Sequence, residues 1–246
     1  NDIPNSTWAA GADSWIITFS YINYVINRIM SITHYPSQPP AAIPGLSATN
    51  VRLANASPPE IIEHVHDVAA CPVISTNFRP LSIALVHLVN RIIPRIPVLW
   101  VDHGYNTPET RAFVRQVTAA FGLNLHVYRP RLGDAGPGNT GVPPLETPAH
   151  ARFTQRVKLE PFARALAEWK PDYWITGIRA DQTEYRRTLD VFSAGPQGSI
   201  RVAPFFRWTE IDVEGYIYDH GLPDYTNYTD PTKGPAEREC GLQQLG

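Results

Sequence analysis

Apolar residues in the central part of the chain follow two alternating patterns. Short continuous runs, such as residues 73–75 and 97–101, are typical of strands that are buried on both faces. Between these runs, apolar side chains recur at helical spacing from Leu81 to Ile92, which predicts a helix with one buried face. Strands and helices that alternate in this way form parallel sheets. We therefore predict an α/β fold with an open, mainly parallel twisted sheet and helices on both faces.

Capping residues and glycines mark the ends of the predicted helices. Ser57, Thr107 and Thr209 can each accept a backbone N–H group in a first helical turn, and Gly122 and Gly221 can end a helix. The Gly- and Pro-rich residues 129–149 are predicted to form a mobile loop. The pattern as a whole predicts strands at residues 73–75, 97–101, 123–128, 172–176 and 199–205, and helices that begin at residues 58, 80, 108, 160 and 210.

The first part of the chain differs from this pattern. Residues 15–32 fit an amphipathic helix, because polar residues interrupt the apolar run and would be costly inside a bilayer. Prolines within residues 36–44 then favour an extended connector. We predict an accessory segment at residues 1–56, whose helix packs on the main domain or on a second subunit. The main domain is predicted at residues 57–246.

Composition limits the kinds of site and partner. The chain has 21 Lys and Arg residues against 23 Asp and Glu residues, so its net charge gives no general attraction to nucleic acid or to an anionic membrane. Two cysteines, Cys71 and Cys240, cannot supply a four-cysteine zinc or iron–sulfur site. The N-terminus shows no secretory signal pattern. We expect no bound metal and a cytoplasmic protein with reduced thiols.

Polar segments follow three of the predicted strands, at the sheet edge where open parallel sheets bind ligands. The first segment combines hydroxyl, amide and guanidinium side chains with a helix N-terminus, which suits a phosphate or sulfate. Ordinary helix capping explains this pattern about equally well. The second segment is Asp102 to Tyr105, and the third is Gly177 to Arg187. In the second segment, His103 is a better candidate for ligand contact than His87, which lies on an apolar helix. The first segment consists of Ser75, Thr76, Asn77, Phe78 and Arg79.

The third segment concentrates positive charge after a strand. Arg179, Arg186 and Arg187 lie within a few residues of one another, and Lys158 is expected to add a fourth cation. Planar guanidinium groups bind phosphates through two hydrogen bonds, so the cluster favours a multiply anionic ligand. The alternative is an ordinary charged helix face in contact with solvent.

Cys240 lies between charged residues and glycine a few positions from the end of the sequence. Such surroundings do not favour burial of a thiol in a core, so Cys240 is a candidate nucleophile. The alternative is a nucleotide-binding protein in which this cysteine has no role. Cys71, beside a proline before a strand, is interpreted as a small buried apolar residue, and His87 as a structural histidine.

Several motifs in order along the chain resemble the phosphoadenylyl-sulfate (PAPS) reductase family. The resemblance covers residues 57–246, and its most specific parts are Gly177-x-Arg179-x-x-Gln182 and Glu239-Cys240-Gly241-Leu242. Further matching residues are the Ser75 to Phe78 run, Asp102 to Tyr105, Pro108 to Thr110, Lys158 with Glu160-Pro161, Pro204 with Trp208, and His220 to Leu222.

This resemblance implies an adenine-nucleotide α-hydrolase fold, PAPS as substrate and attack by Cys240 on the sulfonate sulfur. The products would be adenosine 3′,5′-bisphosphate and an S-sulfocysteine, from which thioredoxin or glutaredoxin would release sulfite. Arg238 and Glu239 would assist the thiol, and a mobile C-terminal tail would carry it. The family commonly forms homodimers. The implied substrate-binding residues are Ser75, Thr76, Asn77, Phe78, Arg79, Asp102, His103, Lys158, Gly177, Arg179, Gln182, Thr183, Arg186 and Gln243.

The sequence departs from the family pattern at three places. Arg79-Pro80 replaces the usual glycine after phenylalanine, so a side chain of Arg79 would have to replace close backbone approach to an anion. Gln243 stands where histidine is usual and cannot supply charge to a thiolate. The linker before Cys240 is short.

These departures keep three alternatives open. One is an enzyme that uses ATP or another adenylyl compound, as pyrophosphatases of this fold do. Another is a nucleotide binder without turnover. The third is a cluster-free reductase of adenylyl sulfate. Related adenylyl-sulfate reductases usually hold an iron–sulfur cluster through additional cysteines, and the two cysteines here cannot supply them, so the PAPS-using branch is favoured and no cluster is expected.

Overall fold

The computed structural model describes residues 43–131, 141–223, 225, 228 and 230–233. All of these residues belong to one compact unit, Ala42–Gly246. The predicted N-terminal helix at residues 15–32 and the cysteine-containing tail lie outside the described residues. No helix in the described ranges is long and apolar enough to cross a membrane.

The described residues form a six-stranded sheet with the strand order β3-β2-β1-β4-β6-β5. All neighbouring strands are parallel except β5, which runs antiparallel to β6 at one edge. The open, mainly parallel sheet predicted from the sequence is therefore confirmed. The strands are β1 (Pro72–Thr76), β2 (Pro97–Val101), β3 (Asn124–Tyr128), β4 (Tyr173–Ile175), β5 (Phe192–Ala194) and β6 (Ile200–Val202).

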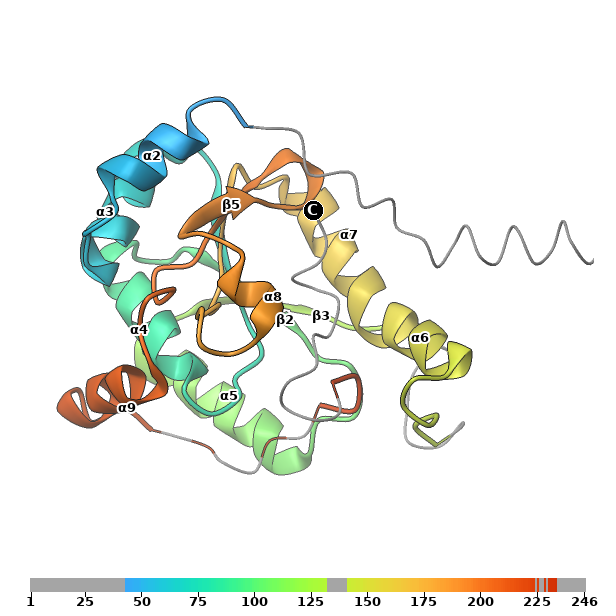
Figure 1. The fold of residues 1–246 in the computed structure, drawn as a ribbon. Coiled ribbons are helices and arrows are strands. Elements are labelled where there is room, and N and C mark those ends of the chain that lie inside the picture. Colours follow the sequence, from blue (N-terminus) through green and yellow to red (C-terminus); the bar gives the residue numbers. More distant parts are fainter. Residues whose placement is uncertain (1–42, 132–140, 224, 226–227, 229, 234–246) are drawn as a thin grey trace, which may run out of the picture. The chain divides into compact units, whose positions relative to one another are not determined.

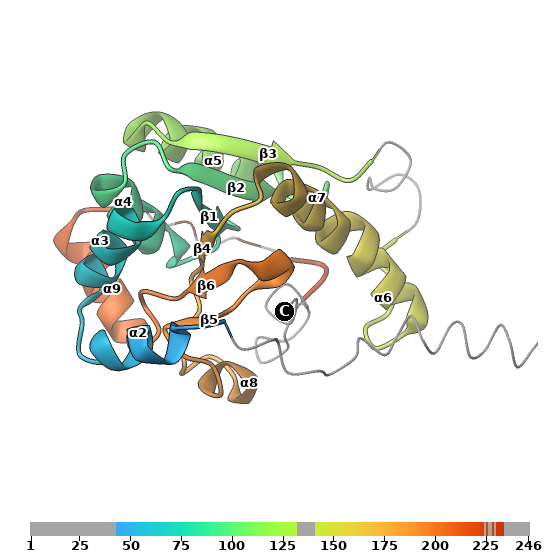
Figure 2. The ribbon, with the colours of Figure 1, turned by 90° about the horizontal axis from the view of Figure 1, so that it is seen from above.

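Helices cover both faces of this sheet (Figures 1 and 2). One core cluster joins Ile74, Val98 and Ile175 of the strands to helices α3, α4, α5 and α9. The other joins Val73, Leu99 and Trp174 to α7 on the opposite face. The helices are α2 (Leu46–Arg52), α3 (Pro58–Val68), α4 (Ser82–Ile92), α5 (Pro108–Phe121), α6 (Pro148–Thr154), the π-helix η1 (Gln155–Leu159), α7 (Glu160–Trp169), α8 (Glu184–Arg187), the 3-10 helix η2 (Pro196–Gly198) and α9 (Glu210–Asp219).

Three predicted helix starts are confirmed by their capping contacts. The Ser57 N–H group donates to the Glu60 carboxylate at 2.7 Å before α3. The Thr107 hydroxyl accepts the Thr110 N–H group at 3.1 Å before α5. Thr209 and Asp212 satisfy each other's backbone N–H groups before α9. Each contact satisfies a donor that a helix N-terminus would otherwise leave unpaired.

Two helices differ from the sequence prediction. Helix α4 begins at Ser82 and not at Pro80, because Leu81 has a left-handed backbone with φ of 68°. Helix α6 begins at Pro148, within the predicted loop, and continues through η1 into α7. Pro161 has no N–H group, so it predicts a helix start. In the structure the chain is already helical before Pro161, because the π-helix η1 leads directly into α7.

The described part of the predicted accessory segment packs on the main domain. The Asn50 side chain in α2 donates to the Phe192 carbonyl at 2.7 Å and accepts the Phe192 N–H group at 3.0 Å. Leu46 and Leu53 also pack against the larger core. Helix α2 thus covers β5, an edge strand that was not predicted from the sequence. The domain boundary after residue 56 remains a prediction.

Candidate active site

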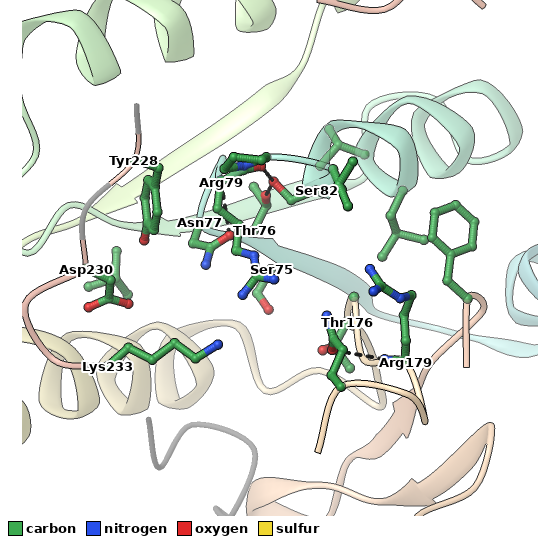
Figure 3. A pocket seen from close by; sticks show the side chains of 18 of the residues that line it. Ser75, Thr76, Asn77, Arg79, Ser82, Thr176, Arg179, Tyr228, Asp230 and Lys233 are labelled. Carbon is green, nitrogen blue, oxygen red and sulfur yellow. Dashed lines mark hydrogen bonds between the residues drawn. The ribbon is translucent and has the colours of Figure 1, made fainter. Parts of the chain in front are cut away.

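A pocket opens at the carboxyl ends of the strands, where the chain order reverses on either side of β1 (Figure 3). β2 lies on one side of β1 and β4 on the other, which is the topological switch point at which open sheets bind ligands. Residues from all three predicted segments line it. The predicted residues at the pocket are Ser75, Thr76, Asn77, Arg79, His103, Lys158, Gly177, Arg179, Gln182 and Arg186.

The loop after β1 is held by its own side chains. The Phe78 N–H group donates to the Thr76 hydroxyl at 3.1 Å, and the Arg79 N–H group donates to the Asn77 side chain at 3.3 Å. The Ser82 hydroxyl donates to the Arg79 carbonyl at 2.7 Å. Two backbone N–H groups that could contact an anion are therefore already used, so the loop offers charge mainly through the Arg79 side chain.

The Arg79 guanidinium has no hydrogen bond or ion pair with any residue in the described ranges. Burial lowers its pKa, and the nearby cations Arg186 and Arg179 lower it further. A partly buried cation beside other cations is electrostatically unfavourable. This arrangement favours an anionic ligand that would offset the charge.

Arg179 and Arg186 approach the pocket from the segment after β4 and are only 6% and 7% exposed. Arg179 forms ion pairs with Asp181 at 3.1 Å and Glu210 at 3.2 Å. The Gln182 side chain accepts hydrogen bonds from the Arg179 N–H group and the Arg186 guanidinium. The alternative of a solvent-exposed charged helix face is therefore wrong for these two arginines.

Arg187 behaves differently from its neighbours. It is exposed and forms an ion pair with Glu184 at 2.6 Å, one helical turn away. Thr183 does not line the pocket, because its hydroxyl caps α8 by accepting the Arg186 N–H group at 3.2 Å. The predicted contact of Thr183 with a ligand stays a prediction.

Lys158 lines the pocket together with its counter-ion Asp230, which was not predicted from the sequence. Its ammonium group pairs with the Asp230 carboxylate and donates to the Thr232 hydroxyl at 3.1 Å. Burial would raise the pKa of Asp230, but Lys158 and Thr232 together lower it to about 2. Lys158 therefore enters the site as one half of a buried ion pair.

Further pocket residues were not predicted. Thr176 directly precedes the predicted Gly177, and Ser82 ends the first loop, so a wider window around each strand end would have included them. The sequence around residues 228–233 carries no comparable signal. Figure 3 shows Tyr228, Asp230 and Lys233 on the side of the pocket that faces the loop after β1, and Arg179 on the segment that follows β4. The missed residues are Ser82, Thr176, Tyr228, Asp230 and Lys233.

Comparison with known proteins identifies the family. The model of the phosphoadenosine phosphosulfate reductase domain matches residues 71–229, which is more than half of the chain. The chain belongs to this family. Members are oxidoreductases that act on sulfur groups, and the resemblance found in the sequence is confirmed.

Curated relatives carry the same family name. A phosphoadenosine 5′-phosphosulfate reductase of Synechococcus sp. is 31% identical over 188 residues, which cover 75% of this chain and 81% of the relative. The enzyme of that name from Thiocapsa roseopersicina is 36% identical over 160 residues, or 62% of this chain and 64% of the relative. The chain therefore spans somewhat less than two thirds of the second relative's length.

Solved structures agree on the fold. A PAPS reductase from Candida auris in a phosphate complex superposes with a TM-score of 0.63 at 22% identity, covering 73% of this chain and 87% of that one. An FMN adenylyltransferase from Candida glabrata, in complex with FAD and pyrophosphate, gives a TM-score of 0.51 at 14% identity, covering 75% and 62%. These similarities confirm the nucleotide-binding α/β fold.

Two residues of the PAPS reductase pattern lie beside the pocket and not on it. Phe78 is 1% exposed and packs edge-on against Trp100, with ring centroids 5.7 Å apart. Asp102 is 1% exposed, and its carboxylate accepts hydrogen bonds from Asn106, Arg111 and Arg129. Both residues thus pack behind the pocket lining, and the ligand contact predicted for them stays a prediction.

Burial would raise the pKa of the Asp102 carboxyl group, but the hydrogen bonds from Asn106 and Arg111 outweigh it and lower the pKa. Asp102 therefore stays ionised and holds Arg129, which follows β3, beside the end of β2.

The predicted catalytic residues of the PAPS reductase pattern fall in the part of the chain that is not described. Arg238, Glu239 and Cys240 lie outside the described residues, and so does the predicted substrate-binding residue Gln243. Cys71 precedes β1, at the opposite end of that strand from the pocket, and its thiol donates to the Trp169 carbonyl at 3.4 Å. It is partly exposed, so the interpretation of Cys71 as a buried residue is wrong.

His87 is a structural residue, as predicted. Its Nδ1 atom lies 2.9 Å from the Tyr216 hydroxyl, and its ring packs against Phe121 and His220. The described ranges hold no group of three His, Cys, Asp or Glu side chains arranged for a metal ion. The expected absence of a metal or a cluster remains a prediction.

Proposed function

We propose that this protein reduces 3′-phosphoadenylyl sulfate to sulfite and adenosine 3′,5′-bisphosphate. The observation that carries this proposal is the convergence of Arg79, Arg179 and Arg186 on one pocket at the switch point of a PAPS reductase fold. PAPS carries several negative charges, and planar guanidinium groups suit phosphate and sulfonate oxygens. The Arg79 guanidinium in particular forms no ion pair with any residue in the described ranges.

Cys240 is proposed as the nucleophile. Its thiolate forms a bond to the sulfonate sulfur while the bond from that sulfur to the phosphate oxygen breaks, and adenosine 3′,5′-bisphosphate leaves with the electron pair. A thiolate of thioredoxin or glutaredoxin then attacks the sulfur of Cys240. Sulfite leaves with the electron pair of the broken sulfur–sulfur bond, and a second thiol of the partner reduces the mixed disulfide.

The length of chain available is consistent with this role. Lys233 lines the pocket, and Cys240 follows it by seven residues. Seven extended residues span at most about 25 Å. Cys240 therefore belongs to a segment whose beginning is fixed at the pocket by Asp230 and Lys158.

The proposal includes no bound cofactor, a cytoplasmic location that keeps the thiols reduced, and a homodimer of the kind common in the family. Two cysteines in the whole sequence support the absence of a four-cysteine cluster. Sedimentation of the purified chain with and without residues 1–42 tests whether the N-terminal segment contributes to assembly.

Sulfite release from PAPS with reduced thioredoxin tests the function. We expect release by the unmodified chain and by Cys71→Ser, and loss of release with Cys240→Ser, because only Cys240 is proposed to attack sulfur. Wild-type turnover by Cys240→Ser would contradict the mechanism. Parallel reactions with adenylyl sulfate separate the two sulfonucleotides, and faster turnover of adenylyl sulfate would contradict PAPS as the substrate.

A further inference from the structure

His103 occupies a buried position at the pocket. It follows β2 by two residues, is 2% exposed, and lines the same pocket as Ser75, Arg79 and Lys158. Its ring lies near Tyr105, with centroids 6.3 Å apart. A buried imidazole must find partners for both ring nitrogens within the protein or from a ligand.

One ring nitrogen has a fixed partner. The backbone N–H group of Tyr105 donates to Nδ1 of His103 at 3.2 Å. An N–H group can donate only to a nitrogen that carries no proton, so Nδ1 is an acceptor and the neutral ring carries its proton on Nε2. The turn after β2 thereby selects the tautomer.

The charged surroundings leave the ring neutral. Burial lowers the pKa of His103 to about 4, and the neighbouring charges oppose one another, since Asp230 and Asp102 raise the pKa while Lys158 and Arg111 lower it. Near neutral pH the ring carries no charge. In this structure His103 thus adds no positive charge to the pocket.

The other ring nitrogen lacks a partner. Nε2 of His103 is buried and has no hydrogen bond to any residue in the described ranges. Both nearby carboxylates are already engaged, Asp230 with Lys158 and Thr232, and Asp102 with Asn106, Arg111 and Arg129. A buried donor without a partner destabilises the protein, and native structures rarely keep one.

We propose that the Nε2–H group of His103 donates a hydrogen bond to an anionic oxygen of the phosphosulfate group of the bound nucleotide. This inference rests on the proposed function for the identity of the ligand. The imidazole acts as a neutral donor of fixed direction that positions the phosphosulfate group, while the pocket arginines supply the positive charge. The Tyr105 N–H group is the positioning contact that keeps the donor on Nε2.

Two substitutions separate the donor from the turn. In His103→Asn, the shorter side chain places its oxygen near the former Nδ1, where it can still accept the Tyr105 N–H group, but no donor reaches the Nε2 position. In His103→Gln, the amide nitrogen can lie near the former Nε2 and donate, while the acceptor at Nδ1 is lost. Each variant therefore keeps one of the two contacts.

Binding is measured by calorimetry with PAPS in the Cys240→Ser variant of this chain, which is expected not to consume the nucleotide. We expect His103→Asn to weaken binding at least about tenfold, because a hydrogen bond to a charged group is lost. His103→Gln is expected to stay within about threefold of the parent, which is the range of a retained donor. Parent-like affinity of His103→Asn, or equal weakening in both variants, would overturn the proposal.

A nuclear magnetic resonance readout separates this inference from the proposed function. The imidazole nitrogens of His103 should show the Nε2–H tautomer from pH 5 to 8, and the Nε2–H proton should shift downfield when PAPS is added. Sulfite release with no response at Nε2–H overturns the hydrogen bond alone. A response at Nε2–H with no sulfite release by the unmodified chain overturns the reductase function alone.

Discussion

Two cations at the pocket, Lys158 and Arg79, differ in what surrounds them. Lys158 is 5% exposed and forms a buried ion pair with Asp230, which belongs to the segment that leads to Cys240. Arg79 is partly buried, has no ion pair in the described ranges, and lies near Arg186 and Arg179. We infer that Lys158 holds the segment around Asp230 against the sheet through their ion pair. Arg79 forms no such pair, so its positive charge is available to an anionic ligand.

The largest expected effect comes from breaking the Lys158 pair. Lys158→Met leaves the Asp230 carboxylate buried without a counter-ion, which should lower the free energy of unfolding by about 3–5 kcal/mol. Urea unfolding measures the loss. The double variant Lys158→Met/Asp230→Leu removes both charges and should recover most of the stability. A single variant as stable as the unmodified chain would show that the pair does not fasten the segment.

Arg79→Met should act on binding and not on stability. We expect the affinity for PAPS to fall by about 1.5–3 kcal/mol, the contribution of a hydrogen bond to a charged group. Because Arg79 has no described ion pair to lose, the free energy of unfolding should stay the same or rise. Calorimetry and urea unfolding check the two parts. Marked destabilisation by Arg79→Met would remove the contrast with Lys158.

Asp230 predicts a pH dependence of the same ion pair. Its pKa in the folded protein is about 2, below the ordinary value of 3.8, so its contribution to stability is present above pH 4. It is lost as the pH falls from 4 toward 2, by about 2 kcal/mol. Unfolding measured across this range should show the loss in the unmodified chain and a smaller one in Asp230→Asn. Parallel curves for the two proteins would contradict the assignment.

Substitution of Arg187 should have the smallest effect on stability and binding, and it serves as a control for Arg79, Arg179 and Arg186. Its ion pair with Glu184 is exposed, and exposed pairs contribute about 0–1 kcal/mol. Arg187→Ala should therefore leave stability and the KM for PAPS nearly unchanged, in contrast to Arg79→Met. Steady-state kinetics check this prediction. A large rise in KM with Arg187→Ala would mean that positive charge in general, and not the position of Arg79, governs binding.

The sheet could be predicted from the sequence because its signals are local. The continuous apolar run Pro97–Val101 became β2 with the predicted limits, and the capping residues Ser57, Thr107 and Thr209 each precede a helix. These features depend on neighbours a few residues away. The edge strand β5 was missed because a strand of three residues carries too little pattern to be distinguished from a loop.

The site could be predicted only in part, because side-chain direction depends on contacts far along the chain. Strand ends brought Ser75, Arg79 and Arg179 to one pocket, as expected for a parallel sheet. Strand-end placement also predicted that Asp102 would line the pocket. Its carboxylate instead pairs with Arg111 and Arg129 and does not line the pocket.

Asp230 could not have been found by this reasoning. It is 72 residues from Lys158 in the sequence, and no spacing rule connects two residues so far apart. Helical spacing links residues three or four positions apart, and strand-end placement applies only to segments that directly follow a strand. The pairing that fastens the late segment to the pocket is visible only in the folded chain.

The central claim is that Cys240 takes an SO3 group from PAPS bound in the arginine-lined pocket. Mass spectrometry of the peptides obtained after incubation with PAPS, without a reductant, tests it most directly. The account predicts that the peptide containing Cys240 gains the mass of SO3 and loses it when reduced thioredoxin is added. An unchanged Cys240 peptide in a chain that still releases sulfite with thioredoxin, or the same gain on Cys71, would contradict it.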